Sequence, residues 1–217
     1  MEAILIALHV ISGEISLIIG LPAMLAVKGS RLHRQSGTIY FHSMLFTCLS
    51  GMILGLHPFN VILFPVATLS LYLVIFGKFF PRLIHSSANQ HLRIQLGAFA
   101  ALSFLVGMLS LVYCSAQFVL HGRGGFLILF LFALGFCLIS WADFRLLKNK
   151  TISYKQGITG HAARMGGSYI AVFTAFLVNQ VNLMPSYITW LLPSIIGSFL
   201  IRRALQVFMA KRRPASR

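Results

Sequence analysis

Acidic side chains are almost absent from this sequence. Of its 217 residues only three are Asp or Glu, against 18 Lys or Arg, and charged residues make up 10% of the chain. An average soluble domain carries about 25% charged residues, so a soluble globular fold of this size is excluded. Disorder is excluded too, because 58% of the residues are apolar and 19 are Phe, whereas disordered chains have low hydrophobicity. A polytopic protein of the lipid bilayer remains.

Several motifs of common enzyme classes are missing as well. The sequence has no H-x-x-x-H or H-E-x-x-H pair, which disfavours a zinc hydrolase. The three Cys residues form no C-x-x-C pair, so they predict core packing and not a redox motif. The glycines at 122–125 have the pattern of a tight turn and do not form a phosphate-binding loop.

Apolar stretches long enough to cross a bilayer occur seven times, since a spanning helix needs about 20 residues. No segment shows the alternation of barrel strands. We predict an all-α fold, a single seven-transmembrane-helix bundle at 1–210 followed by a basic cytoplasmic tail at 211–217. The predicted helices cover residues 3–27, 38–57, 61–79, 94–120, 125–146, 160–181 and 186–208.

The basic residues predict the orientation of this bundle. With seven spans, every Lys and Arg except Arg123 and Arg164 lies on one side, in segments 28–37, 78–93, 145–160 and 202–217. The positive-inside rule then places the N-terminus outside and the C-terminus in the cytoplasm. Basic residues next to membrane helices favour anionic lipid head groups as partners, and we expect no nucleic-acid binding.

Ionisable residues inside the membrane are costly and mark functional sites. His42 lies about 6 Å inside the cytoplasmic boundary, and His161 and Arg164 enter at a similar depth. Asp143 reaches the same layer from the opposite direction, near the inner end of the fifth helix. Two interpretations of Asp143 remain open: a buried ion pair with Arg164 that fixes two helices, or a charged wall of a cofactor or substrate cavity.

Two histidines at equal depth on different helices are typical of a bis-imidazole haem site. We therefore predict a redox bundle with haem b between His42 and His161, and with Arg34 and Arg164 near the propionates. His9 and His57, in the outer half, form a weaker candidate for a second metal site, because their levels differ by about 9 Å.

A carboxyl group at the bilayer midplane supports an alternative function. Glu14 lies in the middle of the first helix, among apolar neighbours. It is either a protonated group bonded to another helix or the coupling residue of a small ion-coupled transporter or permease, with Asp143 as a second coupling residue. A third possibility is a component without a ligand of its own, which acts as partner to another membrane protein or as a homo-oligomer.

The sixth stretch carries small residues at every fourth position, namely Ala163, Gly167, Ala171 and Ala175. Such stripes allow helix backbones to approach closely in a membrane. We therefore expect this helix at the centre of the bundle, with the stripe at its tightest contact.

Two short motifs suggest a relationship. They are His33-Arg34-x-x-Gly37-x-x-Tyr40 and His161-x-x-Arg164-Met165-x-x-Ser168-Tyr169, together with His9 and the run Thr174-Ala175-Phe176. In these residues the chain resembles a family of uncharacterised bacterial polytopic membrane proteins, from about residue 5 to residue 200. The resemblance implies a multi-pass protein of the bacterial inner membrane and brings no established reaction with it.

Overall fold

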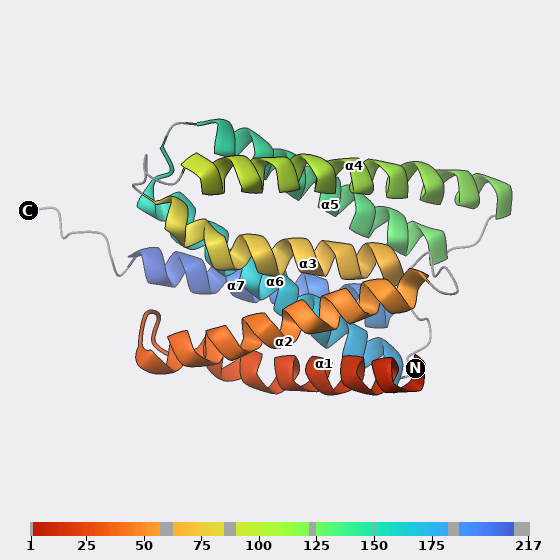
Figure 1. Ribbon diagram of the computed structural model, residues 1–217, viewed down its shortest axis with the longest axis horizontal. Helices are drawn as coiled ribbons and strands as arrows, with labels where there is room; N and C mark the ends of the chain where they lie inside the picture. Colours follow the sequence, from red (N-terminus) through yellow and green to blue (C-terminus); the bar gives the residue numbers. More distant parts are fainter. Residues whose placement is uncertain are drawn as a thin grey trace, which may run out of the picture.

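Seven α-helices make up the described part of the chain, as a computed structural model shows for residues 2–56, 63–84, 90–121, 125–149, 151–181 and 187–210 (Figure 1). This confirms the predicted all-α fold. In the described residues, the one extended pairing is a parallel bridge between Ile84 and Ile152. The elements are α1 (Glu2–Leu25), α2 (Arg31–Leu56), α3 (Leu63–Phe79), the 3-10 helix η1 (Phe80–Leu83), α4 (Gln90–His121), α5 (Gly125–Lys148), α6 (Tyr154–Gln180) and α7 (Tyr187–Ala210).

Six of the helices are long and apolar enough to cross a membrane: α1, α2, α3 with η1, α4, α5 and α7. The remaining helix, α6, has a similar length but carries Lys155, His161 and Arg164, which lower its hydropathy. The fold is thus that of a membrane protein, while the orientation of the termini stays a prediction. The predicted tail at 211–217 and His57 lie outside the described residues.

Most of the basic residues lie at one end of the bundle. There α1, α3, α5 and α7 finish and α2, α4 and α6 begin, on the left in Figure 1. We call it the basic end, and it is the end predicted to face the cytoplasm.

Two helices begin earlier at the basic end than hydropathy predicts. α2 starts at Arg31 and not at 38, and α6 at Tyr154 and not at 160. Each start is capped: Ser30 Oγ accepts a hydrogen bond from the His33 backbone N–H at 3.2 Å, and Ser153 forms a capping box with Gln156. Hydropathy marks where a helix enters hydrocarbon, whereas caps mark where the helix begins. Both motif histidines, His33 and His161, consequently lie on helices.

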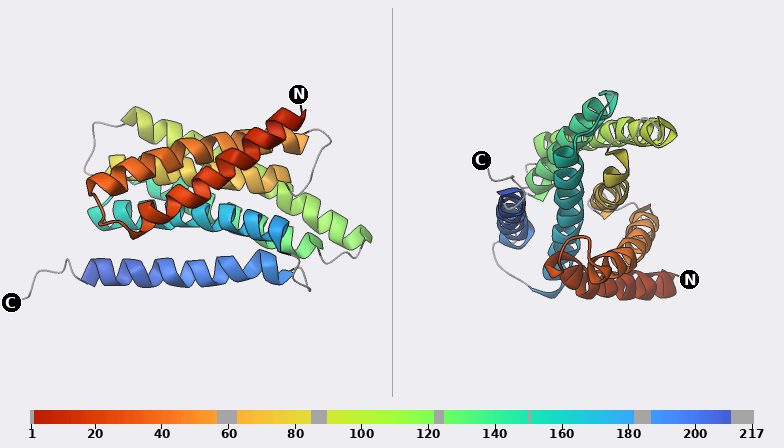
Figure 2. Two further views of the ribbon diagram at one scale, coloured as in Figure 1. Left: turned by 90° about the horizontal axis from the view of Figure 1, so that it is seen from below. Right: turned by 90° about the vertical axis from the view of Figure 1, so that its left-hand side faces the viewer.

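The predicted central position of α6 is confirmed, but the predicted contact face is wrong. α6 crosses the bundle diagonally and packs on α1, α3, η1 and α7 (Figures 1 and 2). Ala163 and Ala175 of the small-residue stripe are exposed. The close approaches instead occur at other positions, where Gly160 meets Phe80 and Gly166 meets Ile201. Gly160 and Gly166 form the close contacts in place of the stripe because they face bulky side chains of η1 and α7.

The buried core has two parts, and α3 contributes to both. The larger cluster surrounds Tyr72, Phe76 and Phe80, whose side chains are fully buried where α3 and η1 meet α4 and α5. The second cluster lies where α2, α3 and α6 meet, around Tyr40 and Val74. These two clusters fix the faces of α3 and α6 from which the polar residues described below project.

Replacing Gly160 by Ala tests the close approach of α6 to η1. A Cβ at this position would lie 2.5 Å from Cε1 of Phe80, and the buried ring has little room to move. We expect a loss of about 1–3 kcal/mol of stability, as for other overpacked cores, measured as a lower Tm of the detergent-purified protein. Gly97→Ala on α4 is the control, because nothing lies within 4 Å of the added carbon. Equal Tm values for both variants would contradict this packing.

Candidate functional site

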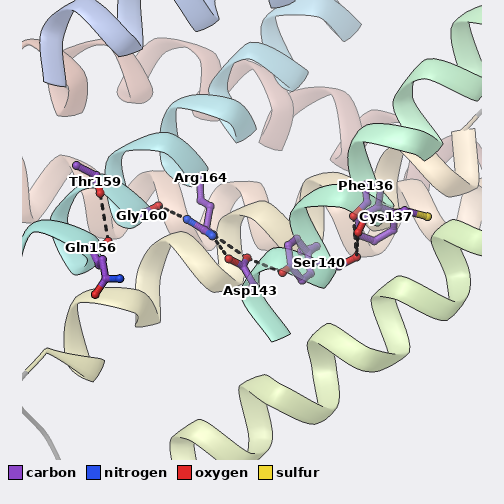
Figure 3. Close-up of polar contacts among 9 residues, drawn as sticks. Phe136, Cys137, Ser140, Asp143, Gln156, Thr159, Gly160 and Arg164 are labelled. Carbon is purple, nitrogen blue, oxygen red and sulfur yellow. Dashed lines mark hydrogen bonds and ion pairs between the residues drawn. The ribbon is translucent and has the colours of Figure 1, made fainter. Parts of the chain in front are cut away.

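A buried ion pair joins α5 to α6 near the basic end. The side chain of Asp143 is 1% exposed and forms a two-pronged salt bridge with Arg164, in which Nε donates to Oδ2 at 2.9 Å and Nη2 donates to Oδ1. Tyr72 of α3 donates its hydroxyl to Oδ2 at 2.6 Å. Arg164 Nη1 also donates to the Gly160 carbonyl at 2.9 Å (Figure 3). Of the two interpretations of Asp143, the ion pair with Arg164 is therefore present, and three helices share it.

Two aromatic rings pack against the guanidinium of this ion pair. The Arg164 guanidinium lies 4.4 Å from the ring centre of Phe80 and 6.0 Å from that of Phe76. Such cation–π contacts are strongest where water is excluded. The guanidinium is fully occupied by a carboxylate, a carbonyl and two rings, so Arg164 forms a structural junction and is not placed to hold a ligand.

Two imidazoles meet on the other side of α6. The ring centres of His33, in the first turn of α2, and His161, in α6, are 6.2 Å apart, and the ring planes stand edge to face at 77°. His161 Nδ1 bonds to the Gly77 carbonyl of α3 at 2.6 Å, and His33 Nδ1 bonds to the Ala23 carbonyl of α1 at 2.8 Å. Four helices thus converge on one pair of rings.

Local sequence explains why both carbonyls accept an imidazole. In a continuous helix the Gly77 carbonyl would accept from the N–H of residue 81, but that residue is Pro81 and has no N–H. Ala23 lies in the last turn of α1, where carbonyls have no helical partner. Each histidine therefore satisfies a backbone group that would otherwise be unpaired at the edge of the membrane.

These bonds also fix the proton position on each neutral ring. A carbonyl oxygen only accepts, so Nδ1 must be the donor in both residues. In the neutral tautomer Nε2 of His33 and of His161 then carries a lone pair. Histidines that bind a metal usually donate their other ring N–H to a carboxylate, a backbone carbonyl or water, and the bond of each imidazole here to a backbone carbonyl belongs to this group.

The charge around the imidazole pair is positive. Lys28 of the α1–α2 turn and Lys78 of α3 both act electrostatically on His161. Lys28 donates to the Met24 carbonyl, and partial desolvation lowers the pKa of its ammonium group. Lys78 Nζ lies 5.3 Å from the ring centre of Phe41 and 3.5 Å from Thr38 Oγ1. This environment favours an anionic ligand.

The structure does not bring His42 to His161, in contrast to the sequence prediction. His42 is exposed and its ring contacts that of Phe41, with centres 5.2 Å apart. The reason is helical phase: nine residues separate His33 from His42, and at about 100° per residue they point to opposite sides of α2. Since His33 faces α6, His42 must face outward. Arg34, the predicted propionate partner, is also exposed.

The His33 and His161 motifs have the same seven-residue spacing, which produces a second contact between α2 and α6 further from the basic end. Tyr40 stands seven residues after His33, and Ser168 seven after His161. The Tyr40 hydroxyl and Ser168 Oγ are hydrogen bonded at 2.8 Å, both buried. A seven-residue step returns to nearly the same helix face, so α2 and α6 meet in two layers. This common spacing is the signal in the sequence that would have selected His33 over His42.

His9 lies in a polar seam between α1 and α2. Its Nδ1 is 3.0 Å from Ser50 Oγ, and deeper along the seam Thr47 donates to Ser12 Oγ and Ser16 donates to Ser43 Oγ, each at 2.8 Å. Hydroxyl bonds of this kind hold membrane helices together. The proposed partner of His9 in an outer metal site, His57, lies outside the described residues.

Glu14 is exposed on α1 and does not face the bundle interior. Asp143, the other predicted coupling residue, is held by Arg164 and Tyr72. Within the described residues no group of three or more His, Cys, Asp or Glu side chains is placed to hold a metal ion. The imidazole pair is thus the arrangement with the most specific chemistry.

Comparisons with protein-family models, with curated proteins and with solved structures found no match to this chain.

A double-mutant cycle tests the structural role of the ion pair. Asp143→Leu leaves a buried guanidinium without its carboxylate and is expected to cost about 3–5 kcal/mol. Arg164→Met should also destabilise strongly, because it strands the carboxylate. The double variant should be less destabilised than the sum of the single variants, as measured by Tm and chemical denaturation in detergent.

Ser140→Ala is the matched control for this cycle. Ser140 is fully buried one turn before Asp143, but its hydroxyl donates only to carbonyls of its own helix, so we expect a small effect. Strictly additive effects of Asp143→Leu and Arg164→Met would show that the two side chains do not depend on each other.

Proposed function

We propose that this chain is a membrane redox protein that binds haem b through His33 and His161 at its basic end. The observation that carries the proposal is the paired imidazoles, each with Nδ1 committed to a backbone carbonyl. Both rings are thereby left with an Nε2 lone pair and a fixed orientation. The proposal keeps the haem predicted from the sequence and replaces His42 by His33 as one of the two ligands.

The spacing of the rings supports the binding of one iron by both. Two imidazoles that bind the same ion through metal–nitrogen bonds of about 2 Å would have ring centres no more than roughly 6 Å apart. The observed separation is 6.2 Å. A haem requires only two ligands from the protein, since the tetrapyrrole provides the other four. A pair without a third ligand is therefore a complete protein contribution.

The charges favour haem over a bare divalent cation. Lys28 and Lys78 would repel a free metal ion, whereas they would attract the propionate groups of a haem. The exposed guanidinium of Arg34, next to His33, provides a further cation. Arg164 does not take part, because Asp143 and the Gly160 carbonyl occupy it.

Haem held in this way supplies one-electron transfer. The residues of the chain hold the two imidazoles, and the carbonyls of Ala23 and Gly77 raise the basicity of the rings through their Nδ1–H bonds. The position at the predicted cytoplasmic end means that electrons would be exchanged near that membrane surface. The alternative, an ion-coupled transporter with Glu14 as coupling residue, has weaker support because Glu14 is exposed.

Haem titration of the detergent-purified protein tests this proposal. The native chain should give a six-coordinate, low-spin Soret spectrum with one haem per chain. His33→Gln and His161→Gln should each weaken haem binding at least tenfold, which corresponds to about 1.4 kcal/mol. His42→Gln is the matched control, on the same helix but the opposite face, and should bind as the native chain does. A folded native chain without a Soret band, or equal binding by all variants, would refute haem ligation here.

Pro81→Ala probes the positioning of His161. The substitution restores an N–H that can donate to the Gly77 carbonyl and compete with His161 Nδ1. We expect a shifted midpoint potential or a partly high-spin spectrum with Tm little changed. An unchanged spectrum and potential would mean that this carbonyl does not orient the ligand.

A further inference from the structure

A cavity of about 790 Å³ is lined by residues of α3, α5, α6 and α7. α7 is the outermost helix and lies along α6 (Figure 2). Leu73 of α3 and Ile139 of α5 form the floor of the cavity, and Ala163 and Gly167 of α6 line one wall. The small-residue stripe of α6 therefore leaves space beside α7. The volume lies within the range of about 300–1,000 Å³ that is typical of ligand pockets.

Two basic side chains line this cavity in the half nearer the basic end. Lys155 projects from the first turn of α6, and Arg202 from α7 about 12 Å before the end of that helix. Among the described residues neither side chain has a hydrogen bond or ion pair, and no acidic residue lines the cavity. Long basic side chains can extend toward the interface while their stems stay in apolar surroundings.

The cavity is more polar toward the basic end than deeper in the bundle. Thr159 and Gln206 line the same part as the two cations, together with the apolar Leu205 and Met209. The deeper part is lined mainly by apolar residues, among them Ile139 and Ile170, with Ser198 as a polar exception. An amphiphile with a negative head and a hydrocarbon tail has the same polarity gradient. Anionic lipids are attracted to basic residues at this membrane surface.

We propose that this cavity binds one anionic phospholipid of the predicted cytoplasmic leaflet. Its phosphate would lie between Lys155 and Arg202, and one acyl chain would lie along Ala163 and Gly167 between α6 and α7. The lipid supplies the counter-charge that the chain itself does not provide there. This site is independent of the haem proposal, because the imidazole pair lies on the side of α6 that faces α2 and α3.

Native mass spectrometry of the full chain can count bound lipids. The probes are phosphatidylglycerol and phosphatidylcholine with identical acyl chains, and glycerol 3-phosphate as a head group without a tail. We expect one phosphatidylglycerol to be retained at least fivefold more than phosphatidylcholine, with no retained glycerol 3-phosphate. Retention of glycerol 3-phosphate alone would indicate a soluble phosphate site and overturn the lipid assignment.

Two variants test separately whether lipid binding depends on the basic side chains and on the space in the cavity. Lys155→Gln with Arg202→Gln should reduce phosphatidylglycerol retention to the level of phosphatidylcholine. Ala163→Phe fills the cavity and should have the same effect with all charges intact. The matched control is Arg145→Gln with Arg203→Gln, two exposed cations near the basic end that do not line the cavity; it should retain the lipid.

Equal loss in the control variant would reduce the effect to general surface charge and refute a defined site. Full retention by the Lys155→Gln and Arg202→Gln variant would refute it as well. If Ala163→Phe fails to fold, the charge variant and its control still decide, with Tm measured in phosphatidylcholine as the check on folding.

Discussion

The bridge from Asp143 to Arg164 is the interaction on which the assembly of this bundle depends. α4 and α5 pack chiefly on each other, and α5 has little backbone contact with α6. Asp143 compensates for this by binding Arg164 of α6 and Tyr72 of α3 with one carboxylate. Apolar contacts alone discriminate poorly among helix partners in a membrane, because lipid tails are as apolar as the side chains they replace. A single buried charge pair with fixed geometry specifies which helices meet.

Unpaired backbone carbonyls determine where the two imidazoles lie. Pro81 removes the donor for Gly77, and the end of α1 removes the donor for Ala23. Such groups need partners even at the edge of the membrane, and His161 and His33 supply them. The same bonds leave both Nε2 atoms with lone pairs. A structural requirement of the backbone thus produces, as a direct consequence, a pair of oriented imidazoles in a positive environment.

The sequence predicted the parts of this structure that depend on composition. The all-α bundle follows from hydropathy, and the Asp143–Arg164 bridge follows from two opposite charges at one depth. The face to which each helix residue points was harder to predict. Depth in the membrane alone led to His42 as the partner of His161, but His42 lies half a turn away from the face of α2 that meets α6. The stripe of Ala163 and Gly167 was assigned to a tight contact, yet it lines a cavity. Such choices depend on which faces of neighbouring helices meet, and hydropathy carries no information about that.

The shortage of acidic residues connects the two proposed sites. Of the three Asp and Glu side chains, Asp143 is paired with Arg164, and Glu2 and Glu14 are exposed on α1. The cations at the imidazole pair and those over the α6–α7 cavity therefore have no internal counter-charge in the described residues. Like charges repel each other, so negative groups from outside the chain would stabilise these clusters. Haem propionates and lipid phosphates are such groups, and each also brings an apolar body that fits beside membrane helices.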